Sequence, residues 1–210
     1  LHELGACLRI VRELAAQRGV REGQAVLDGA PPVDVLVGTH NLRRIPDLIE
    51  EAEATGVIAV DLDRGADAFG VPDALTSHAN PVRAYVTAME GCNLVCSFCV
   101  VPRTRGPEIC RPADEIVDEV ASLVGRGYPE VMLLGQTVNS YRFREGDRTW
   151  RMSDLLAALH EIEGIERIKF VTNYPKDMTN DLLAAVRDLP KVSKYLHVPV
   201  QSGSNTVLAR

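Results

Sequence analysis

Three cysteines lie within eight residues of one another, at Cys92, Cys96 and Cys99. Soft thiolates are the ligands that iron–sulfur clusters and zinc prefer, and the short CxxxCxxC gaps let one loop wrap around a single metal centre. A closed structural site uses four ligands, whereas this loop supplies three that are close in sequence. A [4Fe-4S] cluster bound by this loop would therefore keep one iron open to a small ligand.

An open iron favours one kind of chemistry. It can chelate the amino and carboxylate groups of S-adenosylmethionine (SAM) and pass an electron to the sulfonium. A carbon–sulfur bond then breaks to give a 5′-deoxyadenosyl radical, so the cofactor carries the reaction and the protein positions it. Phe98 lies between the second and third cysteines. Its ring is expected to pack against the adenine of SAM, or else to be a core aromatic residue.

Other interpretations of the cysteines stay open. The triplet can be a zinc site with a distant fourth ligand, or a chance group of buried cysteines. Cys110 can be a fourth ligand, which would close the open iron, but we expect it to be incidental because it lies eleven residues beyond Cys99 at the start of a predicted helix.

The elements that must position this loop alternate regularly along the second part of the chain. Apolar runs predict strands over 82–86, 131–134, 168–171 and 195–200, and helical periodicity predicts helices over 112–124, 154–162 and 180–189. Strands that alternate with helices pair in parallel, and the loops at their carboxyl ends carry the chemistry. The cysteine loop directly follows the first of these strands.

The first part of the chain is less regular. Its periodicity predicts a helix over 2–18, a strand over 33–37, a helix over 45–54 and a strand over 57–60, followed by a linker up to residue 80. We therefore expect two domains, 1–80 and 81–210, with the boundary close to Pro81.

Polar residues follow the later strands at the same edge as the cysteine loop, where they can contact the cofactor or merely cap loops. The predicted cofactor-binding residues there are Gly135, Gln136, Asn139, Thr172, Gln201 and Ser202, with Asn173 beside them. A basic group near the loop, Arg103, Arg105 and Arg111, is expected either to contact RNA phosphate or to be a solvated or helix-capping group. No acid–base catalyst is predicted, because His160 and His197 fall in a helix and a strand where structural hydrogen bonds are the default.

Composition limits the classes of protein that fit. A net charge of -6 over 210 residues disfavours nucleic-acid binding over the whole surface, so any RNA contact must be local. No apolar run approaches the roughly 18 residues of a membrane span, and the start, Leu-His-Glu-Leu, has neither Met nor a signal-peptide pattern. We expect a cytoplasmic protein with no membrane partner whose N-terminus is missing.

The cysteine loop resembles that of the MiaB-type tRNA methylthiotransferases, which are radical SAM enzymes. The matching motifs are Glu90-Gly91-Cys92-Asn93, Phe98-Cys99-Val100-Val101-Pro102, Thr104-Arg105-Gly106, Gly38-Thr39-His40-Asn41, Leu134-Gly135-Gln136-Thr137-Val138-Asn139-Ser140-Tyr141 and His197-Val198-Pro199-Val200-Gln201-Ser202-Gly203-Ser204-Asn205. The resemblance implies an α/β fold: a partial radical SAM (β/α) barrel preceded by a partial α/β methylthiotransferase N-terminal domain. It also implies methylthiolation of N6-isopentenyladenosine beside the tRNA anticodon, with the tRNA anticodon loop and an electron donor as partners.

The sequence departs from the family in its first part. That family brings three further cysteines there for a second [4Fe-4S] cluster, and before Pro81 this chain has only Cys7, which we expect to be a buried core residue. The chain is therefore expected to be an incomplete enzyme. Two other functions stay open: methylthiolation of a ribosomal-protein aspartate, as in RimO-type relatives, and a non-catalytic iron–sulfur module with a closed site.

Overall fold

The computed structural model describes residues 35–37, 44–55, 59–61 and 80–209. The chain divides into two compact units, Leu1–Leu75 with Phe98–Gly106 and Thr76–Ser97 with Pro107–Arg210. The helix predicted over 2–18, Cys7, and the linker over residues 62–79 lie outside the described residues. A domain boundary close to Pro81 stays a prediction.

The described part of the first unit is a small α/β arrangement. Strands β1 (Val35–Val37) and β2 (Ala59–Asp61) pair in parallel, and helix α3 (Ile45–Thr55) connects them in sequence. Leu48 and Ala52, four residues apart on one helical face, are buried together with Val35. The predicted helix is confirmed, and the second strand begins two residues later than the pattern predicted. A short helix, α4 (Val101–Thr104), falls in the segment of this unit that follows Cys99.

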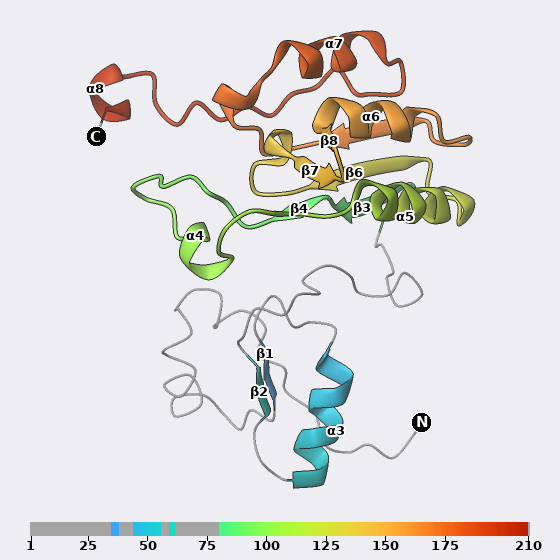
Figure 1. Ribbon diagram of the computed structural model, residues 1–210, viewed down its shortest axis with the longest axis vertical. Coiled ribbons are helices and arrows are strands. Elements are labelled where there is room, and N and C mark those ends of the chain that lie inside the picture. The colour runs from blue at the N-terminus through green and yellow to red at the C-terminus, as the bar shows by residue number, and fades with distance from the viewer. Residues whose placement is uncertain (1–34, 38–43, 56–58, 62–79, 210) are drawn as a thin grey trace. The chain divides into compact units, whose positions relative to one another are not determined.

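The second unit contains a three-stranded parallel sheet in the order β3–β6–β9 (Figure 1). These strands are β3 (Arg83–Thr87), β6 (Glu130–Leu134) and β9 (Arg167–Phe170). The helices that alternate with them are α5 (Ala113–Gly125), α6 (Met152–His160) and α7 (Asn180–Asp188). The predicted parallel α/β arrangement is confirmed for these elements, with each strand within one residue of its predicted start.

One face of this sheet is covered by the helices. Successive strand residues point to opposite faces, and the residues on the covered face include Val86, Leu133 and Phe170, which are all nearly inaccessible. They pack against apolar side chains of the helices, of which Ile116 and Leu156 are fully buried. This burial fixes the register of the strands, because a shift of one residue would expose the apolar set.

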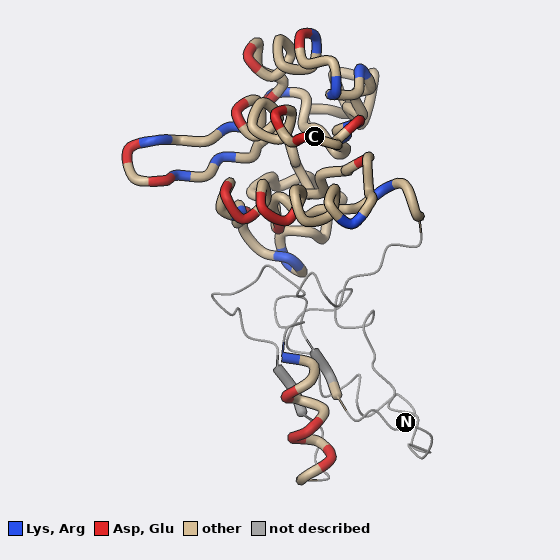
Figure 2. Tube along the Cα trace, turned by 90° about the vertical axis from the view of Figure 1, so that its right-hand side faces the viewer, with Lys and Arg blue, Asp and Glu red and all other residues tan. Residues whose placement is uncertain are grey.

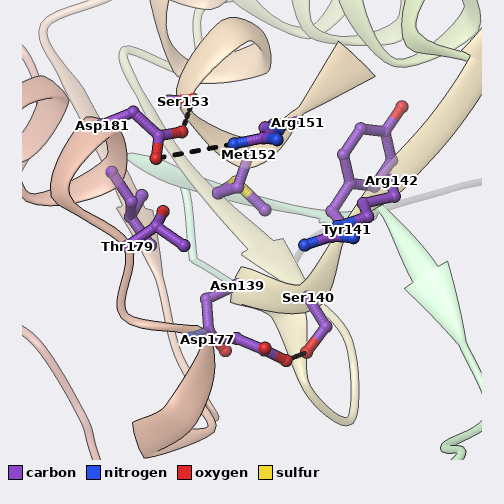
Figure 3. Close-up of a pocket in the computed structure, with 11 residues that line it drawn as sticks. Asn139, Ser140, Tyr141, Arg142, Arg151, Met152, Ser153, Asp177, Thr179 and Asp181 are labelled. Atoms are coloured by element: carbon purple, nitrogen blue, oxygen red, sulfur yellow. Dashed lines mark hydrogen bonds and ion pairs between the residues drawn. The ribbon is translucent and has the colours of Figure 1, made fainter. Parts of the chain in front are cut away.

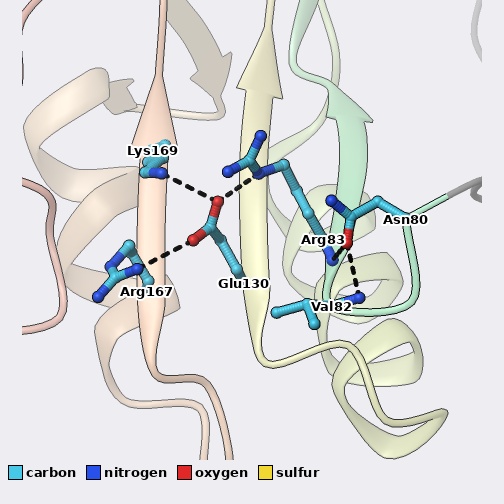
Figure 4. Close-up of polar contacts among 6 residues, drawn as sticks. All are labelled: Asn80, Val82, Arg83, Glu130, Arg167 and Lys169. Carbon is cyan, nitrogen blue, oxygen red and sulfur yellow. Dashed lines mark hydrogen bonds and ion pairs between the residues drawn. The ribbon is translucent and has the colours of Figure 1, made fainter.

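The other face carries a charged group near the amino ends of the strands. The buried carboxylate of Glu130 on β6 accepts hydrogen bonds from Arg83 on β3 and from Arg167 on β9, at 3.2 Å for Arg167, and lies 3.1 Å from Lys169 Nζ (Figure 4). Burial alone would raise the pKa of Glu130, but the contacts with Lys169, Arg83 and Arg167 outweigh it and lower the pKa. Glu130 thus ties all three strands together at the edge opposite to the cysteine loop.

The predicted strand over 195–200 is wrong for this structure. The chain beyond α7 meets β9 at an isolated parallel bridge between Ile168 and Val192, and no strand continues from it in the described residues. Tyr195 and Val200 are more than half exposed, and Leu196 is only partly buried against the core, so little apolar burial holds the segment in the sheet. Pro199 also lacks the N–H that a paired strand needs.

Several short elements were not predicted from the sequence. Strands β4 (Met89–Glu90) and β5 (Ile109–Cys110) pair in an antiparallel fashion on either side of the cysteine loop. Strands β7 (Arg142–Glu145) and β8 (Arg148–Arg151) form a hairpin. The remaining elements are the 3-10 turns η4 (Val138–Ser140) and η5 (Pro175–Asp177), and helix α8 (Asn205–Leu208). Among the described helices, none has the length and apolar character to cross a bilayer.

Candidate functional site

The cysteine loop begins where β4 ends. Gly91 has a φ of 74°, a left-handed conformation that turns the chain out of the strand and that side-chain-bearing residues rarely adopt. Cys92 is buried at the base of the loop, and its sulfur accepts a hydrogen bond from Leu94 N at 3.4 Å. Cys96 is exposed. The hydrogen bond from Leu94 N fixes the position of the Cys92 sulfur at the base of the loop.

The segment after Cys96 carries the third cysteine and the predicted adenine contact. Cys99 is half-buried and free of any disulfide, and the Phe98 side chain is 73% exposed. The alternative that Phe98 is a core aromatic residue is therefore wrong, whereas its contact with an adenine stays a prediction. No group of three Cys, His, Asp or Glu side chains close enough to hold a metal ion occurs among the described residues. That the three cysteines hold one cluster therefore stays a prediction, which their spacing supports.

Glu108 connects the cysteine loop to the neighbouring strand end. Its carboxylate accepts hydrogen bonds from Asn93 Nδ2 at 3.0 Å and from Thr137 Oγ1 at 2.7 Å, and its backbone N–H donates to Asn93 Oδ1 at 3.1 Å. Asn93 lies inside the cysteine triplet, and Thr137 lies in the loop after β6. Sequence analysis missed this connection, because the partners are 15 and 29 residues from Glu108.

The carboxyl ends of β6 and β9 meet in a polar group formed by Gly135, Gln136, Thr172, Asn173 and His197, which we call the strand-end cluster. The Thr172 hydroxyl donates to Gly135 O, and Asn173 Nδ2 donates to His197 O at 3.0 Å. His197 Nδ1 accepts from Thr172 N at 3.3 Å, so His197 has the structural hydrogen bonds that were expected of it. The structure thus brings Gly135 and Thr172, predicted as cofactor contacts, into one place.

Two features of the strand-end cluster are typical of a binding site. Gln136 Oε1 and Asn173 Oδ1 are buried and have no hydrogen-bond partner among the described residues, and such acceptors are costly unless a ligand or water satisfies them. Thr172 has a φ of 63°, and the other described non-glycine residue with positive φ is Gln201, with 64°. Strained backbone of this kind gathers at functional sites. The residues present therefore fit a polar cofactor at this edge.

Gly135 is required by packing as well as by any ligand. A Cβ at this position would lie 2.5 Å from Met89 Cγ, and Met89 is fully buried. The strand-end cluster and β4 therefore approach each other more closely than any side chain at position 135 allows.

Asn139 joins two loops of the second unit through hydrogen bonds. Its amide nitrogen donates to Tyr174 O at 2.8 Å and its oxygen accepts from Tyr174 N at 2.7 Å, so the side chain joins the loop after β6 to the loop after β9. It lines a small pocket in which Ser140 donates to Asp177 and Ser153 donates to Asp181 (Figure 3). Its role as a cofactor contact stays a prediction.

The last predicted residues, Gln201 and Ser202, lie in a turn. Ser202 N donates to Val200 O at 2.7 Å, and Ser202 Oγ accepts from Ser204 N at 3.1 Å. The structure therefore gives Ser202 the loop-capping contacts that were its alternative. The Gln201 side chain is exposed, and a cofactor contact by either residue stays a prediction.

One arginine of the predicted basic group, Arg111, has structural partners, whereas RNA contact by Arg103 and Arg105 stays a prediction. Arg111 is buried and pairs with Glu119 and, at 3.9 Å, with Glu115 of α5, so its predicted contact with RNA is wrong. Burial raises the pKa of the neighbouring Cys110 thiol, and its sulfur accepts a hydrogen bond from Arg142 N at 3.4 Å. A thiol with a raised pKa ionises less readily and so binds metal less readily, in line with the expectation that Cys110 is not a cluster ligand.

Comparison with known proteins identifies the family. Residues 86–210, which include the cysteine loop and the strand-end cluster, match the model of the Radical SAM superfamily. The chain belongs to the radical SAM superfamily. Membership in this superfamily implies a [4Fe-4S] cluster and SAM, and the CxxxCxxC cysteines are present at Cys92, Cys96 and Cys99.

The similarity to known proteins extends beyond residues 86–210. The chain is 46% identical over 202 residues to the tRNA-2-methylthio-N(6)-dimethylallyladenosine synthase of Rhodopirellula baltica, covering 90% of the chain and 42% of the relative. The synthase of Bordetella pertussis has the same identity and coverage over 196 residues. That of Neisseria meningitidis serogroup A is 41% identical over 195 residues, with 90% of the chain and 43% of the relative covered. The predicted resemblance to tRNA methylthiotransferases is confirmed, and the chain spans less than half the length of these relatives.

Proposed function

We propose that the complete protein methylthiolates N6-isopentenyladenosine next to the anticodon of tRNA. The observation that carries this proposal is the identity of 41–46% to tRNA-2-methylthio-N(6)-dimethylallyladenosine synthases over 90% of the chain. A bound [4Fe-4S] cluster would supply the electron for reductive cleavage of SAM. The tRNA anticodon loop is the substrate, and an electron donor is a second partner.

Different residues of this chain would bind the cluster and SAM. The thiolates of Cys92, Cys96 and Cys99 would bind three corners of the cluster, and the hydrogen bond from Leu94 N would orient the sulfur of Cys92. The buried acceptors Gln136 Oε1 and Asn173 Oδ1 would take up donor groups of SAM.

Hydrogen bonds between loops would hold the cluster-binding loop and the SAM-binding residues in place relative to each other. Glu108 ties Asn93 of the cysteine loop to Thr137 at the end of β6, and Thr172 ties Gly135 to β9. The exposed ring of Phe98 is available to stack on the adenine of SAM. Each of these contacts positions the cofactor, and none donates or removes a proton in the reaction.

The organisation of the complete protein is also a proposal. We assign residues 1–80 to a methylthiotransferase N-terminal domain and residues 81–210 to the radical SAM barrel. Cys7 is the one cysteine before Pro81. A second cluster would therefore need ligands from outside this sequence, and it is not part of the proposal.

Mass spectrometry of total tRNA tests the proposed function. A strain that lacks the full-length gene should lose 2-methylthio-N6-isopentenyladenosine and accumulate N6-isopentenyladenosine, and the intact gene should restore the product. A gene carrying Cys96→Ser should not restore it. Unchanged product in the deletion strain, with loss of methylthiolation on a ribosomal-protein aspartate, would instead establish the alternative substrate.

A further inference from the structure

The β7–β8 hairpin has two chemically different faces. The cross-strand register pairs Arg142 with Arg151 and Arg144 with Thr149, and paired residues point to the same side. That side, which we call the arginine face, therefore carries Arg142, Arg144, Arg151 and Thr149. All four residues are exposed. In Figure 2 a ribbon of two strands extends away from the helices, with basic residues on both strands.

The opposite face of the hairpin holds it against the protein. Phe143 and Trp150 are partly buried against the main core. Trp150 Nε1 donates to Glu145 Oε2 at 2.9 Å, and the Arg148 guanidinium lies 3.6 Å from the centre of the Trp150 ring. Arg148 on this face thus contacts the Trp150 ring, and the arginine face lies on the other side of the hairpin.

Among the described residues, the arginines of the arginine face have few acidic partners. Arg142 and Arg151 are directly opposite each other, an arrangement of like charges that destabilises a strand pair. Arg151 lies 3.9 Å from Asp181, and Arg144 Nε donates to Gly146 O at 3.2 Å. Within the described part of the chain, no hydrogen bond or ion pair engages the Arg142 guanidinium. Nearby Asp177 and Asp181 already accept hydrogen bonds from Ser140 and Ser153.

The hairpin is anchored beside the candidate site. The buried hydroxyl of Tyr141 donates to Arg111 O at 2.8 Å, and Arg142 N donates to Cys110 Sγ. Both acceptors lie at the end of β5, directly after the chain that returns from the cysteine loop. A substrate that presents its reacting group at this edge would therefore pass the base of the hairpin.

We propose that the arginine face binds the phosphate backbone of the substrate RNA and holds it at the carboxyl edge of the sheet. This inference rests on the proposed function, because it takes tRNA as the substrate. Guanidinium groups bind phosphate oxygens through paired hydrogen bonds. Residues two apart on a strand lie roughly 7 Å apart, so Arg142 and Arg144 engage separate phosphates. A local patch of this kind reconciles RNA binding with a net charge of -6.

Binding of unmodified tRNA to the full-length protein, measured by fluorescence anisotropy over a series of salt concentrations, tests this inference. The variant Arg142→Gln/Arg144→Gln should bind about tenfold or more weakly at 0.1 M salt, with the slope of log Kd against log salt reduced by about 1.4–1.8. Arg142→Lys/Arg144→Lys should keep most of that slope. Arg148→Gln removes one positive charge from the opposite face and should leave affinity and slope close to wild type.

The other outcomes separate this inference from the proposed function. If the wild type binds and modifies tRNA and the double Gln variant has the same affinity and slope, the arginine face does not bind RNA. An equal loss in Arg148→Gln would likewise overturn the assignment of the face. If the wild type binds no tRNA, or binds an acidic ribosomal-protein peptide through these arginines, the proposed function fails and this inference fails with it. As a control, SAM should change the electron paramagnetic resonance spectrum of the cluster in the double variant as it does in the wild type. This result would show that the cofactor site is intact.

Discussion

The connection made by Glu108 gives the sharpest prediction about stability. Glu108→Ala removes the acceptor of Thr137 Oγ1 and of Asn93 Nδ2. Thr137 is 5% exposed, so its hydroxyl would lose its partner where water has little access, at a cost of about 1–3 kcal/mol. Asn93 is exposed, and water would replace the lost bond at a cost of about 0.5 kcal/mol. We therefore expect a loss of about 1.5–3.5 kcal/mol.

This loss is measurable by thermal unfolding followed by circular dichroism. For a chain of this length, each kcal/mol shifts the midpoint by about 2–4 °C, so Glu108→Ala should unfold roughly 3–14 °C lower. Glu108→Gln keeps one oxygen acceptor and should recover about half of the shift. The control is Glu115→Ala, whose side chain is 54% exposed and lies 3.9 Å from Arg111. If both alanine variants have the midpoint of the wild type, the loop is not held through Glu108.

Three further predictions follow from the same structure. Glu130→Gln should destabilise the chain by about 1–3 kcal/mol at pH 7, because its basic partners lose a charged acceptor. The lowered pKa of Glu130 means that its contribution is complete above the unfolded value of 4.5 and is lost as pH falls through the folded value. Urea unfolding of variant and wild type should therefore converge as pH falls below 4.5, and a constant gap would contradict this prediction. Gly135→Ala should cost about 1–3 kcal/mol, measured by urea unfolding, because its Cβ meets Met89 Cγ, whereas Gly203→Ala meets nothing within 4 Å and should be neutral. Cys110→Ser should leave the iron content and the response of the electron paramagnetic resonance spectrum to SAM unchanged, and a gain or loss of that response would make Cys110 a ligand.

The regular part of the fold could be predicted from local pattern. The runs that become β3, β6 and β9 are bounded by turn residues, and helices α5, α6 and α7 have apolar residues at helical spacing, so burial of one face fixes both period and position. The stretch over 195–200 has the same local pattern. It forms no strand here, because strand formation also needs a neighbour to pair with and apolar contacts that Tyr195 and Val200 do not make.

The chemistry of the site was partly visible in the sequence. Short cysteine spacing and polar residues after strands are local signals, and they pointed to the loop and to Gly135 and Thr172. The contacts of Glu108 join distant segments, which no local pattern encodes. The hairpin did have a signal, the alternation of charged and aromatic residues around Glu145-Gly146-Asp147, which is typical of a tight turn between two strands.

The account depends on a cluster that leaves one iron open for SAM. Its most direct test is electron paramagnetic resonance of the full-length protein, reconstituted anaerobically with iron and sulfide and then reduced. We predict a [4Fe-4S] signal that changes when SAM is added and that disappears in Cys92→Ser, Cys96→Ser or Cys99→Ser. Protein that takes up zinc in place of iron, or an iron signal that SAM does not alter, would contradict the account.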